Sequence, residues 1–122
     1  MWGLSRQQKY WLWTGAADMR RGFDGLSGLV RRELRAQDVL SGDAFVFVNK
    51  RRTQMKILVW ESGGFLLYHK RLEAGTFELP TAQDGNSLAW EALFFMVEGV
   101  KLSGLARRKR FAFPDSNTSS KA

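Results

Sequence analysis

Two clusters of basic side chains are the groups in this chain whose type and spacing are best suited to chemistry. Lys50, Arg51 and Arg52 are consecutive between two apolar runs, and Arg107, Arg108, Lys109 and Arg110 form a second run. Side chains of this kind contact the phosphates of nucleic acids, largely independently of base sequence and more weakly as salt rises. The alternative for any charge run is a solvated surface, and the residues alone leave both interpretations open.

The net charge of +7 is concentrated in the last part of the chain. Residues 101–122 contain six basic residues and one acidic residue, so they supply five of the seven net charges. We therefore expect a polyanion to be attracted mainly by this segment and by Lys50 to Arg52, and not by a uniformly positive body. Arg31 and Arg35 are one helical turn apart on a predicted outer face, where they form either a phosphate-contacting stripe or an ordinary solvated face.

The residues give little support to catalysis. Asp18 and Asp24 are the most suitable carboxylate pair for a metal-dependent reaction, but a helix cap and a favourable place near a helix N-terminus account for both. The chain has no cysteine and one histidine, His69, which we place either at the edge of the core or at the rim of the sheet. We therefore predict no catalytic residue, no metal site and no cofactor.

The element that positions the first basic cluster is a predicted antiparallel meander over residues 44–72. Its three strands, Ala44 to Val48, Met55 to Trp60 and Phe65 to Leu72, are rich in β-branched and aromatic residues. A short glycine-bearing loop, Glu61 to Gly64, joins the last two strands. The first loop, Asn49 to Gln54, contains the three consecutive cations, so the pattern predicts a basic finger held out by a rigid sheet.

A first helix is predicted between Asp18 and Leu34. Phe23, Leu26, Val30 and Leu34 recur at steps of three and four, and Asp18 is the expected N-cap. Gly22, Gly25 and Gly28 oppose a helix, since each glycine costs about 1 kcal/mol relative to alanine. We expect either that their shared side closely approaches the sheet or a partner chain, or that residues 18–25 form a loop and the helix begins at Asp24.

Other segments give shorter signals. Tyr10 to Trp13 predicts an added edge strand, and Thr76 to Leu79 predicts a further short strand. The tryptophans near the N-terminus suit core packing, with base stacking as the alternative. Residues 88–98 predict a second helix, apolar all round and ended by Gly99, that is largely buried or meets another protein.

Together these elements predict one small α+β domain. We expect an antiparallel sheet of three to five strands with two helices packed on it over residues 1–102, followed by a basic, disordered tail over residues 103–122. The sequence shows neither a membrane-spanning run nor a signal pattern, so we expect a cytoplasmic protein.

Several stretches in order resemble a known family. The motif Asp18-Met19-Arg20-Arg21-Gly22-Phe23-Asp24-Gly25 follows Ala17 and precedes Leu26. Downstream come Phe45-Val46-Phe47 with the basic loop, Lys56 to Phe65, Lys70 to Glu73 with Gly75 and Phe77, and the helix ending Val97 to Val100. In order and spacing, over about residues 11 to 102, the chain is similar to the TnpB (Orf2-like) accessory proteins of IS-sixty-six-type bacterial insertion sequences. These are not to be confused with the RNA-guided nucleases that share the name.

The resemblance implies a small, non-catalytic helper of DNA transposition that acts beside a separate transposase. It brings no known active site. The chain departs from the family pattern at Ala89-Trp90, where the last helix usually opens with Thr-Pro, and in its extension after Lys101. We expect DNA contact through Lys50, Arg51 and Arg52, supported by Arg107 to Arg110. The alternative is a protein-interaction module that docks on the transposase, and self-association is a further expectation.

Overall fold

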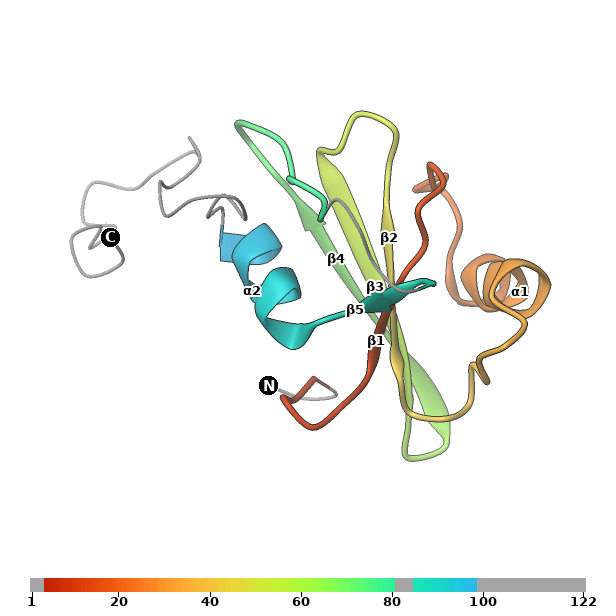
Figure 1. Cartoon of the computed structure of the whole chain (residues 1–122). Coiled ribbons are helices and arrows are strands. Elements are labelled where there is room, and N and C mark those ends of the chain that lie inside the picture. Colours follow the sequence, from red (N-terminus) through yellow and green to blue (C-terminus); the bar gives the residue numbers. More distant parts are fainter. Residues whose placement is uncertain (1–3, 81–84, 99–122) are drawn as a thin grey trace.

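The computed structural model describes residues 4–80 and 85–98, which form a five-stranded sheet and two helices (Figure 1). In chain order the elements are β1 (Tyr10–Leu12), α1 (Phe23–Glu33), β2 (Ala44–Val48), β3 (Gln54–Glu61), β4 (Gly64–Arg71), β5 (Ser87–Leu88) and α2 (Trp90–Glu98). This arrangement confirms the predicted α+β class. The expected tail over residues 103–122 and the helix-ending role of Gly99 lie outside the described residues.

The meander is confirmed as β2, β3 and β4, which pair in antiparallel fashion. Ala44 lies opposite Val59, and Trp60 lies opposite Phe65. The turn between β3 and β4 consists of two residues, Ser62 (φ 51°) and Gly63 (φ 81°), both in the left-handed region. Two consecutive left-handed residues are typical of the type I′ turn, whose twist matches that of the flanking strands.

The strand order is β4-β3-β2-β1-β5, which corrects the expectation that β1 is an edge strand. β1 lies inside the sheet, parallel to β2 and antiparallel to β5. The main chain of Leu12 is held on the β5 side, since its N–H donates to Asn86 O at 2.7 Å and its carbonyl accepts from Asn86 Nδ2 at 2.9 Å. The two-residue strand β5 therefore forms the edge on this side of the sheet, and β4 forms the opposite edge.

The two helices cover opposite faces of the sheet (Figure 1). One core lies on the α1 face, where Leu26, Leu29 and Val30 pack on Phe45, Phe47 and Leu58. The other lies on the α2 face, where Leu93 and Met96 join Val46, Ile57 and Val59. Every residue of β2 is buried, because alternate side chains of this central strand enter the two cores.

The first helix begins later than the prediction of Asp18 as its N-cap implied. α1 starts at Phe23, with Gly22 at the N-cap position and no side-chain cap bond, so the alternative of a loop followed by a helix is close to the structure. Phe23 is 48% exposed and does not continue the buried stripe. A Cβ added at Gly25 or Gly28 would meet only the Arg21 or Arg32 side chain. The glycine side of α1 therefore does not approach the sheet, and its approach to a partner chain stays a prediction.

Two further predictions about short elements were wrong. Residues 76–79 form no strand, although Phe77 is completely buried and its N–H donates to Arg52 O at 2.7 Å. Ser87 and Leu88 belong to β5, so the second helix begins at Trp90 instead of Leu88. In α2 only Leu93 and Met96 are fully buried, and Phe94 is 44% exposed. α2 therefore has more apolar side chains than the described core buries.

Candidate nucleic-acid interface

The basic loop between β2 and β3 has a defined conformation that the Asn49 side chain organises. Asn49 Oδ1 accepts hydrogen bonds from Thr53 N at 2.8 Å and from Gln54 N at 3.0 Å. Arg52 N donates to Asn49 O at 3.0 Å, and Arg52 itself has a left-handed backbone with φ 60°. Side-chain acceptance of this kind replaces backbone bonds that the loop cannot make, so Asn49 fixes the path of Lys50, Arg51 and Arg52.

The chain after β4 supports the same loop from the α2 side. Leu72 N donates to Thr53 O at 2.8 Å, and Phe77 N donates to Arg52 O. Phe77 belongs to the core on the α2 face. The tip is therefore joined to the core through two main-chain contacts, which confirms a hairpin that a rigid sheet supports.

All three predicted cations of the tip are exposed. Among the residues that the structure describes, ion pairs involve Arg6, Arg20 and Arg71, and none involves Lys50, Arg51 or Arg52. No carboxylate of the described residues therefore forms an ion pair with these three cations. A cation held on a preformed loop loses less freedom when it binds an anion than one on a loop without fixed structure.

A second loop, residues 17–22, lies at the same end of the sheet (Figure 1). Ala17 N donates to Val48 O at 3.0 Å, next to the start of the basic loop. Lys56 is only 7% exposed, and its Nζ donates to Met19 O at 2.9 Å and to Arg21 O at 2.8 Å. Lys56 thereby anchors the Asp18-to-Gly25 motif to β3. A lysine in a strand looks like any solvent-facing residue, so the sequence carries no signal for this role.

Asp18 pairs with Arg20 instead of capping the helix. Asp18 Oδ1 accepts from Arg20 N at 2.9 Å, and Oδ2 lies 2.9 Å from Arg20 Nη2. The Arg20 side chain and N–H lower the pKa of the Asp18 carboxyl from 3.8 to about 2. This contact holds the loop and partly neutralises Arg20, so Arg20 is a weaker candidate for phosphate binding than the residues of the tip.

The other predicted cations are not gathered at the tip. Arg31 lies in the last turn of α1, and Arg35 lies in the turn that follows the helix, so the two do not form the expected helical stripe. Both are exposed and, with Arg32, form a separate basic patch. An eleven-residue helix is about 16 Å long and separates this patch from the loop that carries Arg20 and Arg21. Arg107, Arg108, Lys109 and Arg110 lie outside the described residues.

An aromatic surface lies on α2. Trp90 and Phe94 stack with ring centroids 5.4 Å apart, and Phe94 meets Phe95 edge-on at 6.0 Å. The Arg6 guanidinium lies 4.6 Å from the centre of a Trp90 ring. Clustered rings with an exposed member are suited to contact with another macromolecule.

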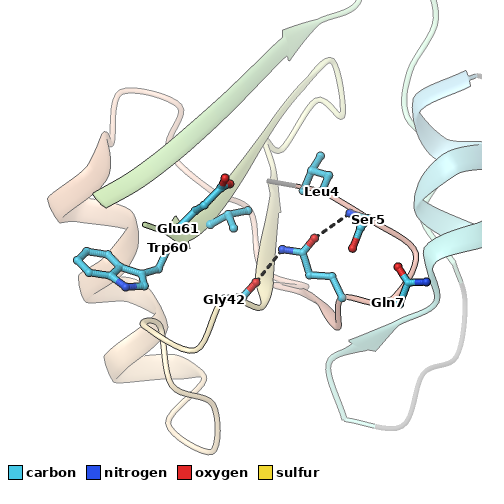
Figure 2. A pocket seen from close by; sticks show the side chains of 8 residues that line it. Leu4, Ser5, Gln7, Gly42, Trp60 and Glu61 are labelled. Atoms are coloured by element: carbon cyan, nitrogen blue, oxygen red, sulfur yellow. Dashed lines mark hydrogen bonds between the residues drawn. The ribbon is translucent and has the colours of Figure 1, made fainter. Parts of the chain in front are cut away.

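An open hollow of about 420 Å³ lies beside the start of β1 (Figure 2). Gln8 closes one side, since its Nε2 donates to Gly42 O at 2.7 Å and its Oε1 accepts from Ser5 N at 2.9 Å. Figure 2 shows Trp60 and Glu61 pointing to opposite sides of β3, with Trp60 toward α1 and Glu61 into the hollow. One oxygen of Glu61, Oε1, is buried with no hydrogen-bond partner.

The described residues contain no cluster of three or more potential metal-ligating side chains. Asp18 is engaged by Arg20, and Asp24 lies in the first turn of α1, where the helix dipole favours its charge. His69 is exposed on β4, which agrees with the predicted place at the sheet rim and not with one at the edge of the core, and its Nε2 lies 2.7 Å from Gln54 Oε1. Neither described helix has the length and hydropathy of a bilayer-spanning segment.

The fold and the surface together define a small α+β domain with a braced cationic loop at one end of its sheet. Residues 8–110 match the family described as "IS66 Orf2 like protein", so the chain belongs to this family of insertion-sequence accessory proteins. The resemblance seen in the sequence is thus confirmed.

Two curated proteins of Sinorhizobium fredii (strain NBRC 101917 / NGR234) are similar to this chain. "Uncharacterized protein y4jC" is 35% identical over 109 residues, which cover 88% of this chain and 92% of that protein. "Uncharacterized protein y4hO" is 33% identical over 94 residues, which cover 75% and 80%. No solved structure gives a significant match.

Proposed function

We propose that this protein assists transposition by binding DNA through backbone phosphates. The observation that carries the proposal is the tip of the β2–β3 hairpin, where Lys50, Arg51 and Arg52 are exposed, braced by Asn49 and free of ion pairs with described residues. Contacts of this kind position a protein on a duplex without reading the bases.

Two other groups of cations support the attraction. Arg31, Arg32 and Arg35 form a second basic patch away from the tip, and Arg107 to Arg110 add charge in the segment outside the described residues. We assign the tip the larger share per residue, because its backbone is fixed by hydrogen bonds and side chains on a fixed backbone give up less conformational freedom on binding.

The test is binding of the 122-residue chain to a labelled duplex over a range of salt concentrations. Each phosphate contact contributes about 0.9 to the slope of log K against log salt, so replacing Lys50, Arg51 and Arg52 by Ala should reduce the slope by about 2.7. The matched control replaces Arg31, Arg32 and Arg35 by Ala, which removes the same charge from the other patch. A chain ending at Leu102 measures the contribution of the C-terminal basic run.

The outcomes separate the alternatives. A much larger loss in the tip variant than in the matched control supports the hairpin as the phosphate-binding element. Equal losses would show that affinity follows net charge and not the loop, and loss only on truncation would assign binding to the C-terminal segment. Absence of binding by the intact protein at low salt would refute the proposal.

A second candidate function is docking on the transposase of the same element, and the aromatic surface of α2 favours it. Phe94 is 44% exposed and stacks on Trp90. Replacing Phe94 by Ala should weaken capture of the purified transposase, with little change on raising the salt, because apolar contact is not screened. Leu40 is also 44% exposed but lies in the connection before β2, so Leu40→Ala is the control. Equal capture by both variants would count against docking through α2.

A further inference from the structure

β4 is an eight-residue edge strand whose first five residues lack the charges, prolines and bulges that usually discourage pairing. It forms one end of the sheet, since β3 is its only neighbour in the strand order of the described residues. Natural edge strands are commonly blunted by charges, proline or bulges. In β4 the stretch Gly64 to Tyr68 contains none of these, and Phe65, Leu66, Leu67 and Tyr68 are each only partly buried. The charged residues are confined to the far end, from His69 to Arg71.

The two-residue turn determines which backbone groups of β4 face outward. In a hairpin of this type the residues flanking the turn, Glu61 and Gly64, form a hydrogen-bonded pair, and bonded pairs then alternate along the ladder. Gly64, Leu66, Tyr68 and Lys70 therefore direct their N–H and C=O groups toward β3. Phe65, Leu67 and His69 direct theirs away from the sheet, where they can pair with an added strand.

We propose that this edge is the interface of a homodimer, in which β4 pairs with β4 of a second copy in antiparallel fashion about Leu67. The charges favour this register, because it brings Glu61 of one copy into line with Lys70 of the other. This inference goes beyond the proposed DNA binding and does not depend on it. In this register Leu67 meets its own copy, Phe65 lies opposite His69, and Leu66 lies opposite Tyr68. About six backbone hydrogen bonds form from the outward-facing residues. Apolar side chains thus meet apolar or aromatic ones, and like charges do not meet.

The register is fixed by Glu61, Gly64 and Lys70. Gly64 lies opposite Glu61 within one chain, and in the dimer it also lies opposite Lys70 of the other copy. The three positions then form a row across three strands on the α2 face, with about 10 Å between the outer two backbones. Gly64 has no side chain to obstruct this row. The lysine ammonium can therefore cross it to reach the Glu61 carboxylate, whose Oε1 is buried with no hydrogen-bond partner among the described residues.

Within one chain these two charges cannot meet. Lys70 lies opposite Met55, six residues along β3 from Glu61, and its Nζ donates to Val97 O of α2 at 3.2 Å. Six residues of strand span about 20 Å. Any energetic coupling between residues 61 and 70 therefore reports contact between two copies, which gives the inference a specific test.

The test measures the mass of the purified 122-residue chain by sedimentation over a concentration series, without DNA. We expect a dimer for the wild type and, for Glu61→Lys or Lys70→Glu alone, a dissociation constant raised by roughly tenfold or more, because each variant opposes like charges twice in its homodimer. An equimolar mixture of the two variants should recover the dimer, since every pair across the mixed interface is again of opposite sign. Lys9→Glu makes the same charge change on an exposed residue remote from β4, and it should leave the dimer intact.

A variant with no charge change tests the row itself. A Cβ at Gly64 would meet nothing within 4 Å in the single chain, so Gly64→Val should fold normally, as near-ultraviolet circular dichroism can verify. Its side chain would block the lysine path and weaken the dimer. A wild type that stays monomeric at the highest concentration overturns the inference, as does a mixture of the charge variants that dimerises no better than each alone. A Gly64→Val dimer of unchanged affinity overturns the proposed register.

Discussion

Replacing Lys56 by Met is the sharpest test of how the family motif is held in place. The Lys56 ammonium donates to the carbonyls of Met19 and Arg21, and its residue is only 7% exposed. A hydrogen bond to a charged group contributes about 1.5–3 kcal/mol, and a buried carbonyl left without a donor costs about 1–3 kcal/mol. Methionine has a similar length and restores the packing, but it provides no donor.

The opposing effect is desolvation, because burying an ammonium costs several kcal/mol that methionine does not incur. Met19 and Arg21 are each partly exposed, so we take the cost per carbonyl at the low end of its range. We therefore expect Lys56→Met to lower the free energy of unfolding by about 2 kcal/mol. For a domain of this size, the melting temperature should fall by roughly 8–16 °C.

The assay combines thermal unfolding with amide hydrogen exchange. The exchange of residues 17–22 should accelerate more than that of β2, because the lost bonds attach that loop and not the sheet. Lys9→Met, at an exposed lysine, is the matched control and should change stability by less than about 0.5 kcal/mol. A Lys56→Met protein as stable as the wild type, with unchanged loop exchange, would refute the reasoning and show that desolvation outweighs the two bonds.

Three further predictions concern the loops. Asn49→Ala removes the acceptor of two backbone N–H groups, so it should lower the free energy of unfolding by about 1–3 kcal/mol and also weaken DNA binding. Asn49→Asp keeps the acceptor and should retain most of the stability. Urea unfolding measures the stability, and titration with a DNA duplex measures the binding. Ser62→Asn should raise the free energy of unfolding by a few tenths of a kcal/mol, roughly, since asparagine tolerates the left-handed backbone before Gly63 better than serine; an unchanged or lower urea midpoint would contradict this. Arg20 lowers the pKa of Asp18, which should be about 2 in an NMR titration. The contact therefore stabilises the fold above pH 3.8, and this contribution disappears as the pH falls through about 2. Arg20→Ala should return the pKa of Asp18 toward 3.8.

Local patterns were sufficient to predict the meander and its basic loop. β2, β3 and β4 are adjacent in sequence and consist of β-branched and aromatic runs between turn residues, so each strand carries its own signal. β5 has two residues, and no periodicity can be read from two positions. The parallel pairing of β1 with β2 depends on contacts more than thirty residues apart, which a local pattern does not encode.

The wrong predictions share a physical origin in tertiary contacts that override local preference. Asp18 is a good N-cap by type, but Arg20 and Lys56 hold its loop in another conformation. Residues 76–79 have strand-like composition, yet Phe77 is used to support the basic loop from the core. Of the candidate site, the exposed tip could be predicted, whereas the buried anchor Lys56 and the separation of Arg31 from the tip required the structure.

The interior position of β1 has a consequence for the order in which the chain folds. Tyr10 pairs with Ala44 and with Leu88, so its two partners are 34 and 78 residues away along the chain. Loop closure over such separations is slow compared with the formation of hairpins between neighbours. During synthesis β2 to β4 can form a meander early, but β1 cannot acquire both neighbours until Leu88 has left the ribosome. The N-terminal strand is thus among the first segments made and among the last to be completed in the sheet.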